Sequence, residues 1–171
     1  MTVPTLIITG TCGVGKSTIA AEINDALAEV EVPNAALDLD ALAWQWPSTS
    51  VFNGDLVFEN LAVMWPNYEA HGATRLVLAR VVEDRTELDR YRAAIPGAEI
   101  IVCRLVAPHA LRVGRLRARM PPGPSRDWHE RRTVELEGIL ARAGVEDFVV
   151  RNDDRGPRAV ALEVLRGAGW L

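Results

Sequence analysis

Short apolar runs alternate with amphipathic stretches along most of this chain. The apolar runs have the length and β-branched content of buried strands, and the stretches between them repeat apolar positions with a helical period of about 3.6 residues. The predicted strands cover residues 5–9, 35–39, 75–79, 99–106 and 148–150. The predicted helices cover residues 17–29, 86–94, 108–120, 126–143 and 158–166. This alternation is typical of an α/β fold around a parallel sheet, and we expect a single domain over residues 1–171.

The segment 41–72 departs from this alternation. It is rich in Trp, Phe and Asn and carries little strand signal. We expect short helices and loops that form an insert over the carboxyl edge of the sheet, where open α/β sheets bind their ligands. Aromatic side chains are equally typical of a small second core, and both interpretations can hold together.

The first predicted strand leads into a phosphate-binding sequence. Residues 10–17 match G-x-x-x-x-G-K-[ST], whose glycines let backbone N–H groups turn toward a phosphate at a helix N-terminus. Lys16 would follow the β- and γ-phosphates, and Ser17 would be a ligand of Mg²⁺. The pattern therefore predicts that the chain binds a nucleoside triphosphate. The family resemblance described below implies that this nucleotide is ATP. The expected nucleotide-binding residues are Gly10, Thr11, Cys12, Gly13, Val14, Gly15, Lys16, Ser17 and Thr18.

The basic residues of the chain are almost all arginine, and they are unevenly distributed along the sequence. Lys16 is the only lysine beside 18 arginines, which crowd between residues 104 and 132 and are absent from 25–69. A net charge of −4 provides no basic field for nucleic acid, so we expect no nucleic-acid partner. The N-terminus lacks the features of a signal peptide, and no apolar run reaches 18 residues. We therefore expect a cytoplasmic protein with no membrane partner.

Cysteine and histidine provide little chemistry here. Cys12 and Cys103 do not form a disulfide framework, and we expect reduced thiols. A helix N-terminus could lower the pKa of Cys12, but the motif allows any residue at that position, so we expect no redox role. The three histidines are scattered and lack ligand spacing, which argues against a structural metal site.

An acidic pair closes the second predicted strand. Asp38 and Asp40 alternate on an extended chain, so both carboxylates can face the phosphate loop. One would hold water on Mg²⁺, for which we favour Asp38, and the other, Asp40, would accept a proton from an acceptor hydroxyl. The alternative is that one of the pair caps the following helix.

Arginines surround a break at Pro121-Pro122-Gly123-Pro124. A hinge of this kind is typical of a mobile lid, which we place at 112–132 and whose guanidinium groups would neutralise a transferring phosphoryl group. The expected catalytic arginines are Arg115, Arg119 and Arg126, with Arg117 as an alternative. For any single arginine, a solvated helix face is the favoured interpretation, whereas for the cluster as a whole we expect one or two arginines at the phosphates.

Two further positions point to ligand contacts. Arg80 stands at the end of the third strand, where an acidic residue often follows an apolar run, and we expect it to contact the acceptor. Asn152 follows the last strand and would lie near the nucleotide base. The guanine-specifying N-K-x-D is absent there, which argues against a regulatory GTPase.

The chain resembles the nucleoside monophosphate kinase-like group of P-loop proteins. The resemblance rests on four features in the same order: the phosphate loop, the acidic pair after the second strand, the basic lid and the short final strand. This group includes adenylate, shikimate and gluconate kinases and chloramphenicol phosphotransferase. The resemblance implies a five-stranded parallel sheet of order 2-3-1-4-5 in a three-layer fold, with ATP and Mg²⁺ as cofactors. Asp38-Leu39-Asp40 matches the Asp-x-Asp of shikimate kinase-like members. The chain also resembles a group of small actinobacterial ATP-binding proteins, and this likeness implies no substrate.

The insert differs from the acceptor domain of adenylate kinase because it has no arginine to hold an acceptor phosphate. Its aromatic rings and amides suit a neutral, partly apolar or ring-bearing small molecule. The expected acceptor-binding residues are Asp40, Trp44, Asn60, Trp65 and Arg80. The leading hypothesis is an ATP- and Mg²⁺-dependent kinase of a small-molecule hydroxyl. The alternatives are a nucleoside or nucleotide kinase, and an ATP-binding or ATPase module that signals to a protein partner.

Overall fold

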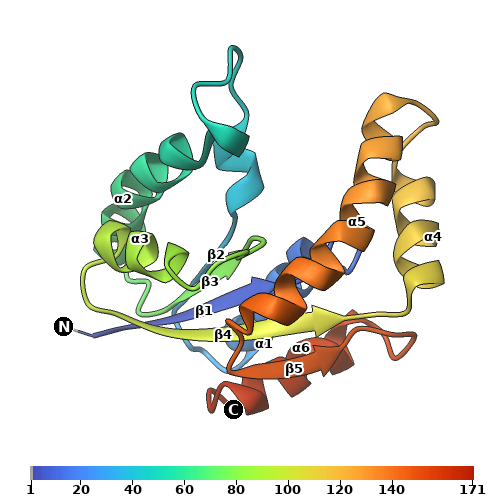
Figure 1. Ribbon diagram of the computed structural model, residues 1–171. Helices are drawn as coiled ribbons and strands as arrows, with labels where there is room; N and C mark the ends of the chain where they lie inside the picture. Colours follow the sequence, from blue (N-terminus) through green and yellow to red (C-terminus); the bar gives the residue numbers. More distant parts are fainter. Residues whose placement is uncertain (1) are drawn as a thin grey trace.

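The computed structural model describes residues 2–171 and has, over this range, a five-stranded parallel sheet with helices on both faces (Figure 1). The strands lie in the order β2-β3-β1-β4-β5, as the resemblance implied. Their bounds are β1 Val3–Thr9, β2 Ala35–Asp38, β3 Leu76–Ala79, β4 Ala98–Val106 and β5 Phe148–Arg151. The helices are α1 Lys16–Glu29, α2 Gly54–Ala70, α3 Glu87–Ala94, α4 His109–Arg119, α5 Pro124–Ala143 and α6 Pro157–Gly167, with short 3₁₀ helices η1 Leu39–Ala43 and η2 Val51–Asn53.

The central strand β1 serves both faces of the sheet. Its register places Thr5 beside Leu76 of β3 and Ile100 of β4. Successive side chains of a strand point to opposite faces, so Ile7 joins one core while Leu6 and Ile8 join the other. Such continuous apolar strands are typical of a parallel sheet that is covered on both sides.

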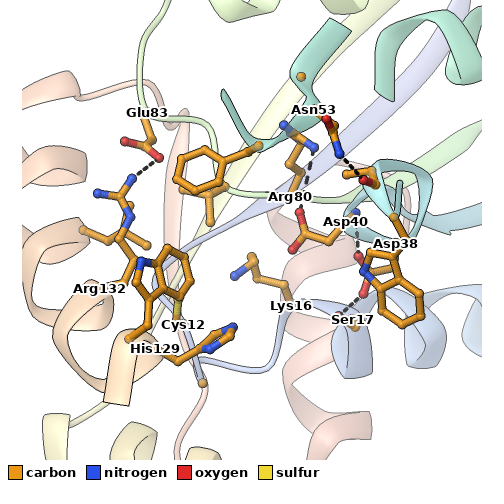
Figure 2. Close-up of a pocket in the computed structure, with 18 of the residues that line it drawn as sticks. Cys12, Lys16, Ser17, Asp38, Asp40, Asn53, Arg80, Glu83, His129 and Arg132 are labelled. Atoms are coloured by element: carbon orange, nitrogen blue, oxygen red, sulfur yellow. Dashed lines mark hydrogen bonds and ion pairs between the residues drawn. The ribbon is translucent and has the colours of Figure 1, made fainter. Parts of the chain in front are cut away.

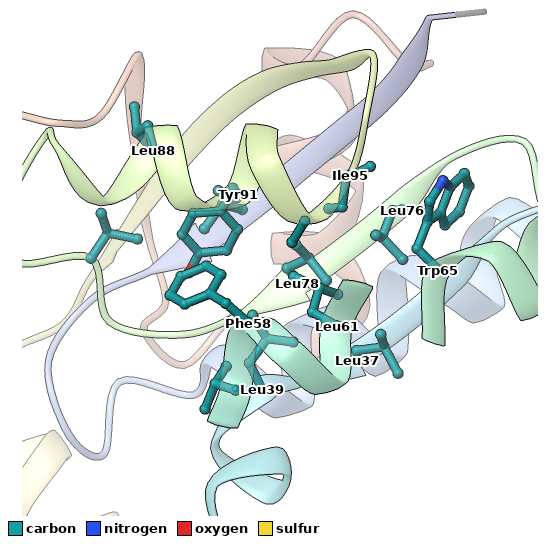
Figure 3. Close-up of a cluster of buried hydrophobic side chains, with 14 of the residues drawn as sticks. Leu37, Leu39, Phe58, Leu61, Trp65, Leu76, Leu78, Leu88, Tyr91 and Ile95 are labelled. Atoms are coloured by element: carbon teal, nitrogen blue, oxygen red, sulfur yellow. The ribbon is translucent and has the colours of Figure 1, made fainter. Parts of the chain in front are cut away.

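Helices α1 and α6 cover one face of the sheet, and α2 and α3 cover the other. The α1/α6 core contains Ile19, Ile23, Leu27, Val160, Val164 and Leu165. The α2/α3 core contains Leu37, Phe58, Leu61, Trp65, Tyr91 and Ile95 (Figure 3). In this second core Phe58 and Tyr91 meet edge to face, with ring centroids 4.9 Å apart.

The insert differs from the expected short helices and loops, because half of it is the long helix α2. Pro66 lies inside this helix, where proline costs a backbone hydrogen bond. The helix persists because Val57, Phe58, Leu61 and Trp65 form one buried face against the sheet. Tertiary burial therefore outweighs the local helix breaker. The second half of the insert is core, as one interpretation expected, although this is part of the main core and not a separate one.

Helices α4 and α5 form a helical hairpin that extends beyond the carboxyl ends of the strands (Figure 1, yellow and orange). The connection at 120–123 falls at the predicted proline-rich break. The hairpin and the insert thus stand on either side of the edge at which β1 delivers its loop.

Candidate functional site

The phosphate loop is the turn between β1 and α1, and its glycines are required by its geometry. Gly13 and Gly15 have φ angles of 74° and 101°, in the left-handed region that side chains disfavour. A Cβ atom on Gly13 would lie 2.5 Å from the carbonyl oxygen of Arg112, and one on Gly15 would lie 2.4 Å from Nδ2 of Asn152. The loop therefore packs too closely against two neighbours to accept larger residues.

Lys16 begins α1 and is the first residue after this turn. Its ammonium donates hydrogen bonds to the carbonyl oxygens of Gly10 and Thr11, both at 3.1 Å. The Lys16 side chain is half-buried, and loss of contact with water lowers the pKa of its ammonium group. The nearby carboxylates of Asp40 and Asp38 oppose this effect. The arrangement holds a compact cation at the N-terminus of a helix, where a phosphate group would stabilise its charge.

Asp38 links the end of β2 to the start of α1. Its Oδ2 accepts a 2.5 Å hydrogen bond from the Ser17 hydroxyl, and its Oδ1 accepts one of 3.0 Å from the Asp40 amide. Asp38 thus caps η1, the alternative left open by the sequence, and also faces the phosphate loop (Figure 2). A hydroxyl oxygen and a carboxylate this close together are hard-oxygen ligands of the kind that Mg²⁺ prefers, so these residues fit the ion.

Asp40 and Arg80 face each other across the same edge of the sheet. Arg80 Nη1 lies 3.8 Å from Asp40 Oδ1 (Figure 2). The Arg80 side chain is 11% exposed, whereas that of Asp40 is 62% exposed. Asp40 is therefore oriented by a nearly buried cation while its carboxylate stays accessible.

These groups line one cavity of about 1260 Å³. We divide its lining residues into two groups by the elements that carry them. The loop half comes from the phosphate loop, the start of α1 and α4, and consists of Cys12, Gly13, Gly15, Lys16, Ser17, Thr18, Arg115 and Arg119. The insert half comes from η1 and the rest of the insert, the segment that follows β3, α3 and α5, and consists of Asp40, Ala43, Trp44, Gln45, Ser48, Phe52, Asn53, Gly54, Phe58, Arg80, Val81, Glu83, Glu87, Arg90, Trp128, His129, Arg132 and Leu136. Asp38, at the end of β2, also lines the cavity and is assigned to neither group.

The hairpin arginines divide into those that line the cavity and those that do not. Arg119 and Arg115 line it, and Arg115 donates hydrogen bonds to carbonyl oxygens of Val14, Asn152 and Asp153 at 3.2–3.3 Å. Arg126, expected to be catalytic, does not line the cavity, and its Nε lies 3.7 Å from Glu130. Arg117 is bound to the same carboxylate. Glu130 therefore binds both arginines, and neither of them lines the cavity.

Two of the expected acceptor-binding residues lie elsewhere. Trp65 is only 3% exposed and belongs to the core beneath α2. Asn60 donates a 3.1 Å hydrogen bond to the Leu42 carbonyl, which ties α2 to η1, and it does not line the cavity. The rotation of α2 about its axis explains both results, because it turns Trp65 toward the sheet and Asn60 toward η1. Trp44, which is 86% exposed, does line the cavity.

Asn152 was expected beside the nucleotide base, and it contacts the phosphate loop. Its Nδ2 donates a 2.6 Å hydrogen bond to the carbonyl oxygen of Val14. The side chain is 6% exposed and packs against Gly15. It supports the loop from the β5 side.

A buried arginine that the sequence did not single out supports the loop from the hairpin side. Arg112 is 2% exposed, and its Nη1 donates a 2.8 Å hydrogen bond to the Thr11 hydroxyl. Its Nη2 lies 2.8 Å from Glu137 Oε2. Thr133 adds a 2.8 Å hydrogen bond from its hydroxyl to the Cys12 carbonyl. The base of the hairpin is therefore joined to the phosphate loop, which no local pattern in the arginine-rich helix could indicate.

The thiols and possible metal ligands are unremarkable. Burial raises the pKa of Cys12, so the anticipated lowering by the helix N-terminus does not prevail. Burial also raises the pKa of Cys103, to about 12. In residues 2–171 we find no group of three or more His, Cys, Asp or Glu side chains that could hold a metal ion. No helix within that range is long and apolar enough to cross a membrane.

Comparisons with known proteins establish the fold. No protein-family model matches the sequence, and no curated protein matches it. Among solved structures, a shikimate kinase from Acinetobacter baumannii is similar with a TM-score of 0.66 and 20% identity, over 96% of this chain and 92% of that one. A gluconokinase from Sinorhizobium meliloti 1021 is similar with a TM-score of 0.64 and 17% identity, over 97% and 91%.

A tunicamycin resistance protein from Deinococcus radiodurans shares the same architecture. Its TM-score is 0.66 at 17% identity, over 99% of this chain and 97% of that one. Identities this low establish the fold alone. The chain has the P-loop kinase fold, which confirms the resemblance found in the sequence.

Proposed function

We propose that this protein is an ATP- and Mg²⁺-dependent phosphotransferase that phosphorylates a hydroxyl group of a small molecule. The observation that carries the proposal is the convergence of Lys16, Asp38 and Asp40 on one cavity at the carboxyl edge of the sheet. The similarity in fold to a gluconokinase and a shikimate kinase agrees with this class of reaction.

The residues of the loop half would bind the triphosphate. The loop amides and Lys16 would hold the β- and γ-phosphates, and the unpaired guanidinium of Arg119 would balance charge that develops during transfer. Ser17 and Asp38 would hold Mg²⁺, Asp38 through a water molecule. When bound, the ion would neutralise charge between the β- and γ-phosphate oxygens. Arg115 would position the loop through its three carbonyl contacts.

Asp40 would act on the acceptor. Its accessible carboxylate would take the hydroxyl proton as the acceptor oxygen bonds to the γ-phosphorus. The bond from that phosphorus to the β–γ bridging oxygen breaks, and ADP leaves. Arg80 would keep Asp40 aimed at the acceptor through their 3.8 Å contact. The products are a phosphate ester, ADP and one proton, so atoms and charge balance.

The test follows ADP release and product mass with ATP, Mg²⁺ and a panel of hydroxyl compounds. Acceptor-dependent ADP release with a phosphorylated product is expected, and Asp40→Asn should lower kcat by about 100-fold or more. Asp25→Asn is the matched control, because it removes an exposed carboxylate of α1 outside the cavity. Unchanged transfer by Asp40→Asn would remove Asp40 as the base. ATP hydrolysis that no acceptor alters would contradict the kinase and favour the ATPase alternative.

A further inference from the structure

The cations of the cavity differ in how they are paired. In the loop half, no carboxylate of residues 2–171 lies within the 4.0 Å ion-pair distance of Lys16, Arg115 or Arg119. Cations without carboxylate partners can receive the negative charge of a bound phosphate chain at little cost. The loop half is therefore built for a polyanion.

Every arginine that lines the insert half already has a carboxylate partner. Arg80 lies 3.8 Å from Asp40, and Arg90 lies 2.6 Å from Asp55. Arg132 forms an ion pair with Glu83, and a second one of 3.2 Å with Glu135 (Figure 2). An acceptor phosphate or carboxylate would have to share these guanidinium groups with the carboxylates already bound to them, and those carboxylates would repel its negative charge.

Aromatic rings from distant parts of the chain meet in the same half. Phe52 of η2 and Trp128 of α5 stand at 61° with ring centroids 6.1 Å apart, although 76 positions separate them in the sequence. They are 54% and 40% exposed, so their faces remain available. The Arg132 guanidinium lies 5.7 Å from the Phe52 centroid, which adds a cation–π contact to this wall.

The segment that carries Phe52 is held in place by its neighbour. Asn53 is 4% exposed, and its Nδ2 donates hydrogen bonds to the carbonyl oxygens of Ala43 and Gln45 at 2.8 and 3.3 Å. Its Oδ1 accepts a 3.0 Å hydrogen bond from the Thr49 amide. Asn53 therefore closes the loop between η1 and η2 (Figure 2). These hydrogen bonds hold the backbone next to Phe52 in place.

We propose that the acceptor is an uncharged hydroxyl compound with an apolar or planar ring, which packs against Phe52 and Trp128. This inference rests on the proposed function and specifies its substrate class. Rings supply the contact area that these faces offer, and the absence of net charge leaves the Arg80, Arg90 and Arg132 ion pairs intact.

The experiment measures kcat/KM for matched acceptors with ATP and Mg²⁺. Nitrophenyl glucoside, glucose and gluconate share a six-carbon polyol skeleton but differ in aromatic ring and in charge, and uridine is matched with uridine monophosphate. In each set we expect kcat/KM for the neutral compound with the planar ring to exceed that of the counterpart without this ring, or with a negative charge, by about tenfold or more. Preference for gluconate or uridine monophosphate would overturn the substrate class and leave the kinase proposal standing. No acceptor-dependent turnover with any probe would instead overturn the kinase proposal.

Variants test whether the named rings are responsible. Phe52→Ala and Trp128→Ala should each reduce the preference for the ring compound by about fivefold or more, mainly through KM. Trp128→Phe keeps a ring and should retain most of the preference. Trp46→Ala is the control, because Trp46 is 91% exposed and does not line the cavity. Thermal unfolding of each variant shows that it is folded. Folded variants that keep the full preference would overturn the assignment of these rings.

Discussion

The two halves of the cavity are built in different ways. The loop half is formed mainly by consecutive residues of one turn, supported by Arg112 and Asn152 from behind. The insert half is assembled from η1, η2, the end of β3, α3 and α5, which are far apart in the sequence. Its arginines are paired and the rings of Trp44, Phe52 and Trp128 are exposed, whereas the cations of the loop half have no carboxylate partners within residues 2–171. On the proposed function, the phosphate donor would bind in a half built from one local turn, and the acceptor would bind in a half assembled by long-range packing.

The largest effect is expected from removing Lys16, the central cation of the loop half. Lys16→Ala should lower phosphoryl transfer by about a thousandfold or more, because no other lysine exists and the guanidinium groups stand farther along the hairpin. Lys16→Arg should restore only a small part of the rate, since a planar fork does not replace a compact ammonium. Initial rates with saturating acceptor measure the effect. Transfer by Lys16→Ala at about a tenth of the wild-type rate would contradict the assigned role.

Two tryptophans of the insert separate stability from acceptor binding. Trp65→Ala should destabilise the protein by about 3–5 kcal/mol, because it empties the core beneath α2. Trp44→Ala removes an exposed ring, so its free energy of unfolding should change by no more than about 0.5 kcal/mol while the acceptor KM rises. Urea unfolding and steady-state kinetics measure the two quantities. The reverse pattern would show that the insert is oriented differently.

Two arginines of α4, each bound to a glutamate of α5, form the next comparison. Arg112→Leu removes a buried contact to the loop and should destabilise the protein by about 2–4 kcal/mol, with a loss of ATP affinity. Arg117→Leu removes an exposed pair and should leave both the stability and the ATP affinity close to those of the wild type. Chemical unfolding and ATP titration distinguish them. Equal effects would mean that Arg112 does not support the loop.

The smallest expected effect concerns the thiol of the loop half. Burial raises the pKa of Cys12, so less thiolate is present at any given pH than in a free cysteine. Alkylation of Cys12 should therefore be several-fold slower than that of a free thiol near neutral pH, and its rate should still rise with pH above the usual thiol pKa, where the rate of a free thiol has levelled off. Bound ATP should slow it further. Mass spectrometry of labelled peptides gives the rate, and labelling faster than free cysteine would contradict the direction of the shift.

The sequence predicted the fold and the loop half because both are encoded locally. The strands, the turn from Gly10 to Lys16 and the proline-rich break at 121–124 can each be recognised within a few residues. Asp38 was also predictable, because it directly ends a strand that meets the loop at the same sheet edge. Local pattern and tertiary position coincide in these elements.

The insert half could not be predicted in this way. Trp65 and Trp44 look alike in an aromatic stretch, and only the register of α2 against the sheet separates a core residue from a cavity residue. Phe52 and Trp128 meet only because the hairpin folds back toward the insert. Arg112 and Arg126 belong to one basic cluster in the sequence, but one is buried at the loop and the other lies against Glu130. Helix rotation and long-range packing decide these cases.

In the proposed reaction, the γ-phosphoryl group of ATP bound in the loop half is transferred to a hydroxyl group of an acceptor bound in the insert half. The most direct measurement supplies ATP with a radioactive γ-phosphate, Mg²⁺ and the neutral ring-bearing acceptors, and follows the label with wild-type protein and Asp40→Asn. We expect the label to enter the acceptor with the wild type, and we expect Asp40→Asn largely to prevent this. Label that appears only as inorganic phosphate, at the same rate with and without acceptor, would contradict it.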